Sequence, residues 1–185
     1  EAGGVVVQTV ASGPHLRAAV MRDVMLEALH AATERVILTT PYFVPDEPVL
    51  TAMRLASLRG VRVDLVVPRR SDKRICDIVA RSFFEPLLQN GVRIFRHNAG
   101  VLHAKTMTVD NSFALVGSAN TDMRSFFLNF ELGLLLYEAD ATAMLRFCQQ
   151  SYLDQSTPVD EKRLRSRPRS WRLLEGTARL AAPLL

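Results

Sequence analysis

The stretch that decides the fold runs from residue 102 to residue 131 and reads LHAKTMTVDNSFALVGSANTDMRSFFLNFE. Most of its residues are apolar or β-branched, which is typical of buried strands. The same stretch also contains His103, Lys105, Ser118 and Asn120. Polar side chains destabilise a buried sheet unless they are paired. Their presence here indicates a functional site.

Turn residues in the middle of this stretch predict a β-hairpin. Segments 102–109 and 113–116 have strand composition, and Asp110, Asn111 and Ser112 lie between them. Asn and Asp favour turns because their side chains bond the nearby backbone. Gly117 follows the second strand and allows a close approach of the backbone.

The hairpin would bring four chemically useful side chains into one small volume. His103 and Lys105 are two residues apart, so in a strand they point to the same face. Ser118 and Asn120 would return beside them and donate hydrogen bonds. A neutral histidine surrounded by cationic and neutral donors is suited to holding a phosphate group.

The spacing His-x-Lys-x4-Asp followed by Gly-Ser-x-Asn resembles the signature of the phospholipase D superfamily. The matching positions are His103, Lys105, Asp110, Gly117, Ser118 and Asn120. The resemblance implies that Lys105, Ser118 and Asn120 bind the substrate phosphate, and that the Glu131 carboxylate orients His103. It also places Asp110 in the catalytic motif, although its position in the turn favours a structural role there.

Three more selective segments resemble the C-terminal half of bacterial cardiolipin synthases. They are residues 39–46, 120–125 and 129–131, and the similarity extends over about residues 7–153. The resemblance implies phosphatidyl transfer between two phosphatidylglycerols through a phosphohistidine, giving cardiolipin and glycerol. It implies no metal and no cofactor, and analogy with two-motif relatives favours acid/base catalysis for His103.

The family carries two copies of the motif and N-terminal membrane helices, whereas this sequence contains one copy. The second half would come from the same parent chain or from a homodimer mate. A homodimeric, metal-independent phospholipase D-type endonuclease is the alternative enzyme, although nucleic acid is the less favoured partner. An inactive lipid-binding fragment is the third reading.

Composition fits this interpretation without deciding it. The 185 residues are 48% hydrophobic and 23% charged, with a formal net charge of +4. A positive charge suits an anionic lipid or membrane surface. The sequence shows no signal peptide, no long apolar run and no initiator Met, so we expect a fragment that is soluble or peripheral. Its parent would belong to the bacterial inner membrane.

Apolar periodicity predicts an α/β fold, with a mixed, mostly parallel sheet flanked by helices on both faces as an α-β-α sandwich. We expect a catalytic domain at residues 1–153, a basic linker at 154–170 and an amphipathic helix at 171–185. That helix would either lie in a membrane interface or dock on the domain. The expected strands are 5–10, 36–40, 61–67, 92–95, 102–109, 113–116 and 130–137, and the expected helices are 15–33, 48–59, 73–90 and 139–153.

Overall fold

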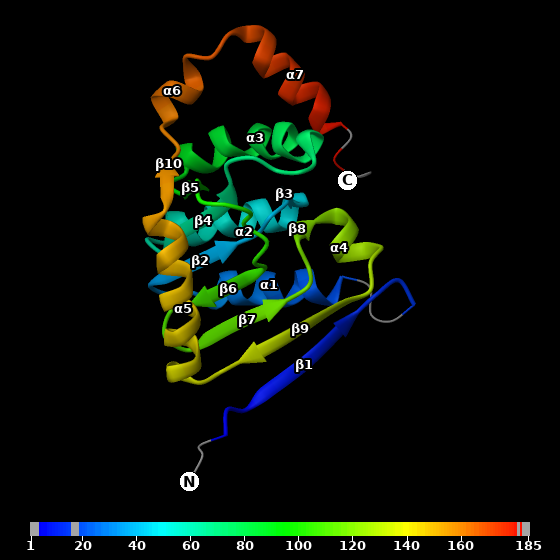
Figure 1. Ribbon diagram of the computed structural model, residues 1–185, viewed down its shortest axis with the longest axis vertical. Coiled ribbons are helices and arrows are strands. Elements are labelled where there is room, and N and C mark those ends of the chain that lie inside the picture. The colour runs from blue at the N-terminus through cyan, green and yellow to red at the C-terminus, as the bar shows by residue number, and fades with distance from the viewer. Residues whose placement is uncertain (1–3, 16–18, 181, 183–185) are drawn as a thin grey trace.

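The computed structural model describes residues 4–15, 19–180 and 182, which form an eight-stranded sheet with helices on both faces (Figure 1). The strand order is β1-β9-β7-β6-β2-β4-β5-β10, and β3 and β8 form a separate pair. The strands are β1 (Val7–Ser12), β2 (Arg35–Thr39), β3 (Phe43–Val44), β4 (Arg62–Pro68), β5 (Arg93–His97), β6 (Thr106–Val109), β7 (Phe113–Gly117), β8 (Thr121–Asp122), β9 (Glu131–Leu136) and β10 (Ser156–Pro158). The helices are α1 (Val20–Ala31), α2 (Glu47–Leu58), α3 (Arg74–Gln89), α4 (Met123–Phe127), α5 (Ala139–Asp154), α6 (Glu161–Arg165) and α7 (Arg169–Arg179).

The expectation of a mostly parallel sheet is wrong. Within the large sheet, as far as the structure describes it, β2–β4 and β4–β5 pair in parallel and every other pairing is antiparallel. A parallel pair needs a crossover connection, usually a helix. Helices α2 and α3 supply those two crossovers. From β6 onward the connections are a hairpin between β6 and β7, a segment with β8 and α4 before β9, and α5 before β10, and the strands they join to the sheet run antiparallel to their neighbours.

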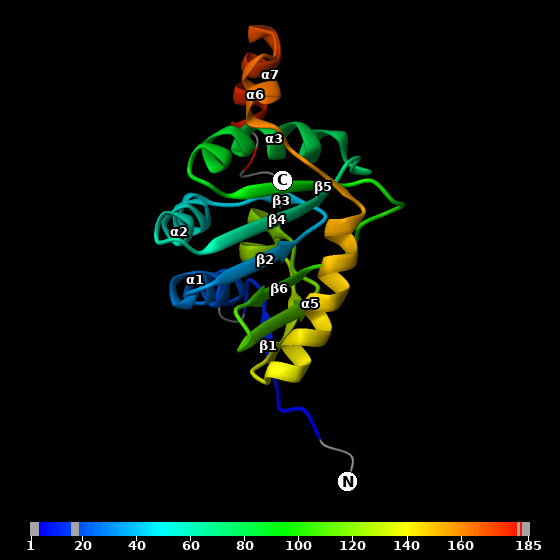
Figure 2. The same ribbon diagram turned by 90° about the vertical axis from the view of Figure 1, so that its left-hand side faces the viewer.

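The expected helix layers on both faces are confirmed. Helices α1, α2 and α3 lie on one face and α5 on the other, as Figure 2 shows. The larger apolar core fills the space beside the first three helices, and its buried members include Met53, Phe84 and Leu115. A smaller core cluster, with Ile37 and Leu102, contains Leu153 of α5.

Gln149 ties α5 to the strands that lead into the site. Its side chain is fully buried, accepts a hydrogen bond from Thr108 Oγ1 at 2.6 Å and donates to the Ile37 carbonyl at 3.1 Å and to Thr106 Oγ1 at 3.1 Å. Buried polar groups are costly unless they are paired. This bonded set therefore fixes one register of α5 against β2 and β6.

The segment that we expected as a basic linker, residues 154–170, is folded. Ser156–Pro158 pairs with β5 as an edge strand, and α6 buries Leu164 against the core. The physical reason is the free edge of β5, whose backbone groups favour pairing with another strand. A three-residue strand is too short to appear as a sequence pattern.

Helix α7 packs against α3 of the same domain. Glu175 is buried and forms an ion pair with Arg167, and the Arg179 guanidinium lies 4.6 Å from the centre of the Phe83 ring. Leu173 of α7 is 73% exposed to solvent, and Leu180, the residue after the helix, is 80% exposed. Residues 181 and 183–185 of the expected helix lie outside the described residues. No described helix has the length and apolar character needed to cross a membrane.

Candidate active site

The candidate site lies where β6 begins and β7 ends, next to the end of β2. The predicted hairpin is confirmed, with Thr106 opposite Val116 and Val109 opposite Phe113. The first strand starts at Thr106, however, and not at residue 102. Both of its neighbours, β2 and β7, end near this level. Before Thr106 the backbone bond to β7 is the one from the Gly117 N–H to the Lys105 carbonyl, at 3.1 Å among the described residues.

Lys105 and His103 lie together just before β6. The Lys105 ammonium is 2.9 Å from the His103 carbonyl oxygen and 3.1 and 3.2 Å from the two ring nitrogens. Burial lowers the pKa of Lys105, and the carboxylates of Glu131 and Asp122 oppose that change. His103 is exposed, so its ring is accessible to a substrate from solvent.

Ser118 and Glu131 form the opposite side of the site. Ser118 Oγ donates to Glu131 Oε2 and accepts from the Leu132 backbone N–H at 3.0 Å. Gly117 makes this approach possible, because a Cβ there would lie 2.6 Å from the Leu132 carbonyl oxygen. Glu131 Oε1 also accepts a hydrogen bond from Asn129 Nδ2 at 3.2 Å, and no bond to His103 is found among the described residues. The Glu131–His103 hydrogen bond implied by the resemblance is therefore not formed in this structure.

Asn120 follows Ser118 and leads into a turn that is closed by a buried carboxylate. The Asn120 backbone N–H donates to Ser125 Oγ at 3.1 Å, and Asn120 Oδ1 is buried without a hydrogen-bond partner among the described residues. Asp122 accepts from the Ser125 backbone N–H at 2.7 Å as the N-cap of α4. Burial raises the pKa of Asp122, against the hydrogen bonds from Ser125 and Asn120.

Sequence reasoning missed the buried carboxylate of Asp122. The sequence does contain a signal for this role. Asp122 precedes a short apolar segment, and aspartate is a preferred residue at a helix N-cap. This carboxylate influences the pKa of Lys105. It therefore belongs to the electrostatic environment of the site.

Two segments far apart in the sequence lie side by side at the rim of the site. Strands β3 and β8 pair in parallel, and the Thr121 backbone N–H donates to Thr40 Oγ1 at 3.1 Å. Phe43 is buried in the core, as aromatic residues commonly are. Tyr42 remains at the rim and donates to Asp72 at 2.7 Å; burial and this bond raise its pKa to about 12.

Asp110 lies at the opposite end of β6 from His103 and Lys105. Its carboxylate accepts four hydrogen bonds, from the backbone N–H groups of Thr33, Glu34 and Arg35 and from the Thr33 hydroxyl, at 2.8–2.9 Å. Its backbone has a φ of 48°, in the left-handed region that Asp and Asn tolerate. The residue thus joins the β6–β7 turn to the segment that enters β2.

The structure therefore brings together five of the six predicted site residues and separates the sixth, Asp110. The five are His103, Lys105, Ser118, Asn120 and Glu131. A phosphate group placed among them would meet a cation and neutral donors beside an accessible imidazole. Because His103 and Ser118 are exposed, the site is open on one side.

Comparison with known proteins supports the resemblance seen in the sequence. A sequence model described as "Cardiolipin synthase, PLD-like domain" matches residues 25–149. The chain is 40% identical over 179 residues to a cardiolipin synthase of Geobacillus sp. (strain WCH70), covering 97% of this chain and 36% of that protein. It is 39% identical over all 185 residues to cardiolipin synthase A of Klebsiella pneumoniae (strain 342). The chain spans 36% and 38% of the length of these two relatives.

Solved structures show the same fold. The phospholipase D family member Nuc from Salmonella typhimurium matches with a TM-score of 0.71 at 20% identity, covering 84% of this chain and 99% of that one. Phosphatidylserine synthase of Haemophilus influenzae Rd KW20 matches with a TM-score of 0.77 at 16% identity, covering 97% of this chain and 48% of that one. Together with the sequence matches, these likenesses establish that the chain belongs to the family described as cardiolipin synthase, phospholipase D-like domain.

Proposed function

We propose that this chain supplies one half of the active site of a phosphatidyltransferase that joins two phosphatidylglycerols into cardiolipin and releases glycerol. The observation that carries the proposal is the contact of Lys105 with His103 just before β6, beside the segment with Ser118 and Asn120. The Gly117 N–H joins that segment to Lys105 by donating to its carbonyl at 3.1 Å. This arrangement occurs in a chain about 40% identical to cardiolipin synthases.

The proposed transfer has two displacements at phosphorus. In the first, a histidine nitrogen attacks the phosphodiester of one phosphatidylglycerol, and the bond to its terminal glycerol breaks. A second histidine gives a proton to the leaving alkoxide. In the next, the terminal hydroxyl of another phosphatidylglycerol loses its proton to that second histidine and attacks the phosphorus. The phosphorus–nitrogen bond breaks, and cardiolipin is formed.

We assign the acid/base role to His103, by analogy with two-motif relatives. Lys105, Ser118 and Asn120 would bind the non-bridging oxygens and stabilise their charge as the bonds change. Glu131 would hold the Ser118 hydroxyl and keep the Lys105 ammonium protonated. Asp110 would act through the fold alone, because its carboxylate is fully engaged at the other end of β6.

Three facts support the idea of a half site. The 185 residues contain one His-x-Lys-x4-Asp motif, whereas the proposed chemistry uses two histidines. The open side of the cluster leaves room for a second body against His103. The curated relatives are also much longer than this chain. The second motif would come from the same parent chain or from another copy of this one.

The substrate would be taken from an anionic membrane surface. A net charge of +4 favours attraction to such a surface, and α7 carries exposed Trp171 and Leu173 on the outside of the domain. We infer a parent protein at the bacterial inner membrane, with the catalytic domain at residues 1–153 and the amphipathic segment at 171–185.

The test is product analysis with phosphatidylglycerol vesicles. The chain is assayed alone, and also in place of the matched segment of the Klebsiella pneumoniae cardiolipin synthase A, with His103→Ala prepared in each form. We expect the segment exchange to yield equal amounts of cardiolipin and glycerol, and His103→Ala to yield neither. If copies pair, the chain alone will show turnover per chain that rises with its concentration.

Two outcomes would contradict the proposal. A correctly folded segment exchange without transfer would mean that this chain does not supply a working half site. Retained turnover in His103→Ala would remove the histidine from the chemistry. Cleavage of DNA without metal, with a steep dependence on salt, would instead identify the endonuclease alternative.

A further inference from the structure

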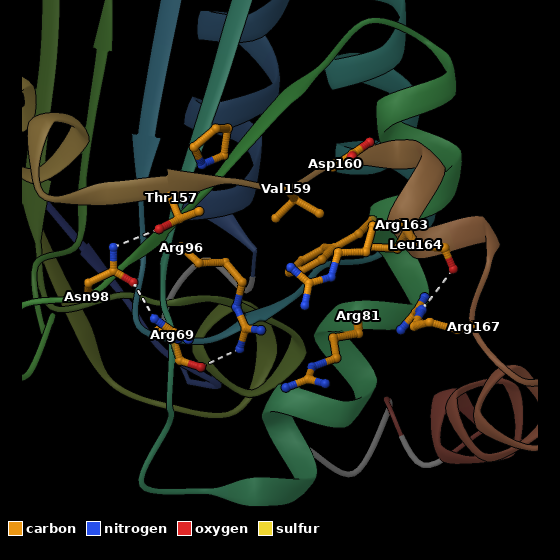
Figure 3. A pocket seen from close by; sticks show the side chains of 12 residues that line it. Arg69, Arg81, Arg96, Asn98, Thr157, Val159, Asp160, Arg163, Leu164 and Arg167 are labelled. Atoms are coloured by element: carbon orange, nitrogen blue, oxygen red, sulfur yellow. Dashed lines mark hydrogen bonds between the residues drawn. The ribbon is translucent and has the colours of Figure 1, made fainter.

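A cavity lies at the outer edge of the sheet, and the predicted site residues do not line it. It has a volume of about 390 Å³ and lies between α3, the β5–β10 edge and α6 (Figure 3). The residues that line it come mainly from these elements and are Arg69, Arg81, Phe84, Arg96, Asn98, Thr157, Pro158, Val159, Asp160, Arg163, Leu164 and Arg167.

The lining is strongly basic. It contains five arginines and one carboxylate, that of Asp160. Two nearby carboxylates offset part of this charge, because Asp77 pairs with Arg81 and Arg96, and Glu175 pairs with Arg167. The positive charges in and around the cavity still outnumber the carboxylates. Such an imbalance in a partly enclosed space favours binding of an anion.

Arg96 is a partly buried member of this charge cluster. Burial lowers its pKa, Asp77 raises it, and the positive charges of Arg81 and Arg69 lower it further. The Nε atoms of Arg96 and Arg81 are buried and have no hydrogen-bond partner among the described residues. Figure 3 shows the side chains of Arg96, Arg81 and Arg163 around the same space. Arg96 also donates to Asp77 Oδ1 at 2.9 Å and to the Arg69 carbonyl. Its remaining Nε–H and that of Arg81 are of the kind that donates to the oxygens of a phosphate.

Part of the cavity wall is apolar, and this favours a ligand that has a carbon-containing part as well as a charge. Phe84 and Leu164 are buried, and Val159 lies beside them. Arg167 connects this lining to α7 through its pair with Glu175. A ligand that fits must therefore combine an anionic group with carbon atoms, as a glycerophosphate does.

We propose that this cavity is a non-catalytic binding site for a glycerophosphate anion, the group that phosphatidylglycerol headgroups and free glycerol 3-phosphate share. In its lipid form it would hold an anionic phospholipid at a distance from His103 and orient the domain on the membrane. The site goes beyond the transfer reaction, because its evidence does not depend on the chemistry of His103.

Two double variants of equal charge test the proposal. Arg69→Ala/Arg163→Ala removes two exposed cations that line the cavity, and Arg70→Ala/Lys162→Ala removes two exposed cations next to them that do not. Binding of the 185-residue chain is measured by co-sedimentation with phosphatidylglycerol vesicles and with phosphatidylcholine vesicles. Thermal unfolding with added sn-glycerol 3-phosphate is the soluble arm. Both variants keep the candidate active site, so the difference between them reports on the cavity.

We expect the cavity variant to bind phosphatidylglycerol vesicles about tenfold more weakly than the matched variant. If the cavity takes the soluble form instead, the matched variant will keep the thermal shift given by glycerol 3-phosphate and the cavity variant will lose it. The proposal would be overturned if the two variants bound the vesicles equally and gave equal thermal shifts with glycerol 3-phosphate. That result would show only the nonspecific attraction of a basic protein to anions. Their unfolding without ligand should agree closely, since all four side chains are exposed.

Discussion

Replacing Asp110 separates the structural part of the motif from its chemical part. Asp110→Asn keeps the shape of the side chain and tolerance of the left-handed backbone, but leaves only one acceptor oxygen. In the structure Oδ1 accepts from the N–H groups of Glu34 and Arg35, whereas Oδ2 accepts from the N–H and hydroxyl of Thr33. The asparagine side chain would therefore lose two of the four hydrogen bonds. Its NH2 group would also face two of the N–H or O–H donors that the carboxylate accepts from.

The magnitude follows from these bonds. A hydrogen bond to a charged group contributes about 1.5–3 kcal/mol. Thr33 and Glu34 are exposed, so water replaces part of what is lost. We expect Asp110→Asn to lower the free energy of unfolding by about 2 kcal/mol, and Asp110→Ala by about 3–4 kcal/mol because alanine also disfavours the positive φ.

Urea unfolding followed by circular dichroism measures these changes. Ser112→Ala is the matched control in the same turn, since its exposed side chain makes no hydrogen bond to the residues that the structure describes; it should stay within about 0.5 kcal/mol of wild type. Phosphatidyl transfer is then measured well below the unfolding midpoint. A variant Asp110→Asn that unfolds like Ser112→Ala but loses transfer would refute the structural role.

The same contacts predict a dependence on pH. Burial raises the pKa of Asp110, but the backbone hydrogen bonds from Arg35, Thr33 and Glu34 and the Thr33 hydroxyl outweigh it, so the net pKa is lowered. A carboxylate with a lowered pKa in the folded state stabilises above its unfolded pKa. That stability is lost as the pH falls through the folded value. The gap between wild type and Asp110→Asn should therefore shrink in acid.

Three further substitutions test other parts of the structure. Gln149→Ala leaves the buried hydroxyl groups around it unpaired and should lower the free energy of unfolding by about 3 kcal/mol in urea titrations. Gly117→Ala places a Cβ 2.6 Å from the Leu132 carbonyl oxygen. This variant should lower the free energy of unfolding by at least about 2 kcal/mol and should also reduce transfer activity. Glu131→Gln removes a charge that raises the pKa of Lys105, so the alkaline limit of turnover should move to lower pH; an unchanged pH profile would contradict this coupling.

The local parts of the fold and site could be predicted from the sequence. The β6–β7 hairpin follows from two β-rich segments around Asp110–Ser112, and it alone brings Ser118 back toward Lys105. Gly117 was expected to allow a close approach of the backbone, and it lies against Leu132. These features depend on residues close together in the chain, where turn chemistry and side-chain alternation determine the geometry.

The features that could not be predicted depend on distant partners. Strand β1 pairs with β9, which lies more than a hundred residues later in the chain. The sequence around either strand does not indicate whether that pairing is parallel or antiparallel. The short strand β10 forms only because β5 offers a free edge. The start of β6 at Thr106 is likewise set by where its neighbours end. Asp122 acquires its raised pKa from burial, which the sequence does not display.

Glu131 illustrates how far a family resemblance extends. The resemblance implies a hydrogen bond to His103, whereas this chain directs the carboxylate to Ser118 and Asn129. The Glu131→Gln pH profile tests whether its charge acts on Lys105. A loss of turnover at every pH, without a shift of the alkaline limit, would instead favour the orienting role toward the histidine.

The central claim is that His103 performs chemistry on a phosphodiester as part of a half site. The most direct test is the initial rate of glycerol release from phosphatidylglycerol vesicles, comparing wild type with His103→Ala in the segment exchange. Because His103 is exposed, its truncation should leave the unfolding midpoint unchanged, while glycerol release falls at least about a hundredfold. Release within twofold of wild type from an equally folded variant would contradict the account.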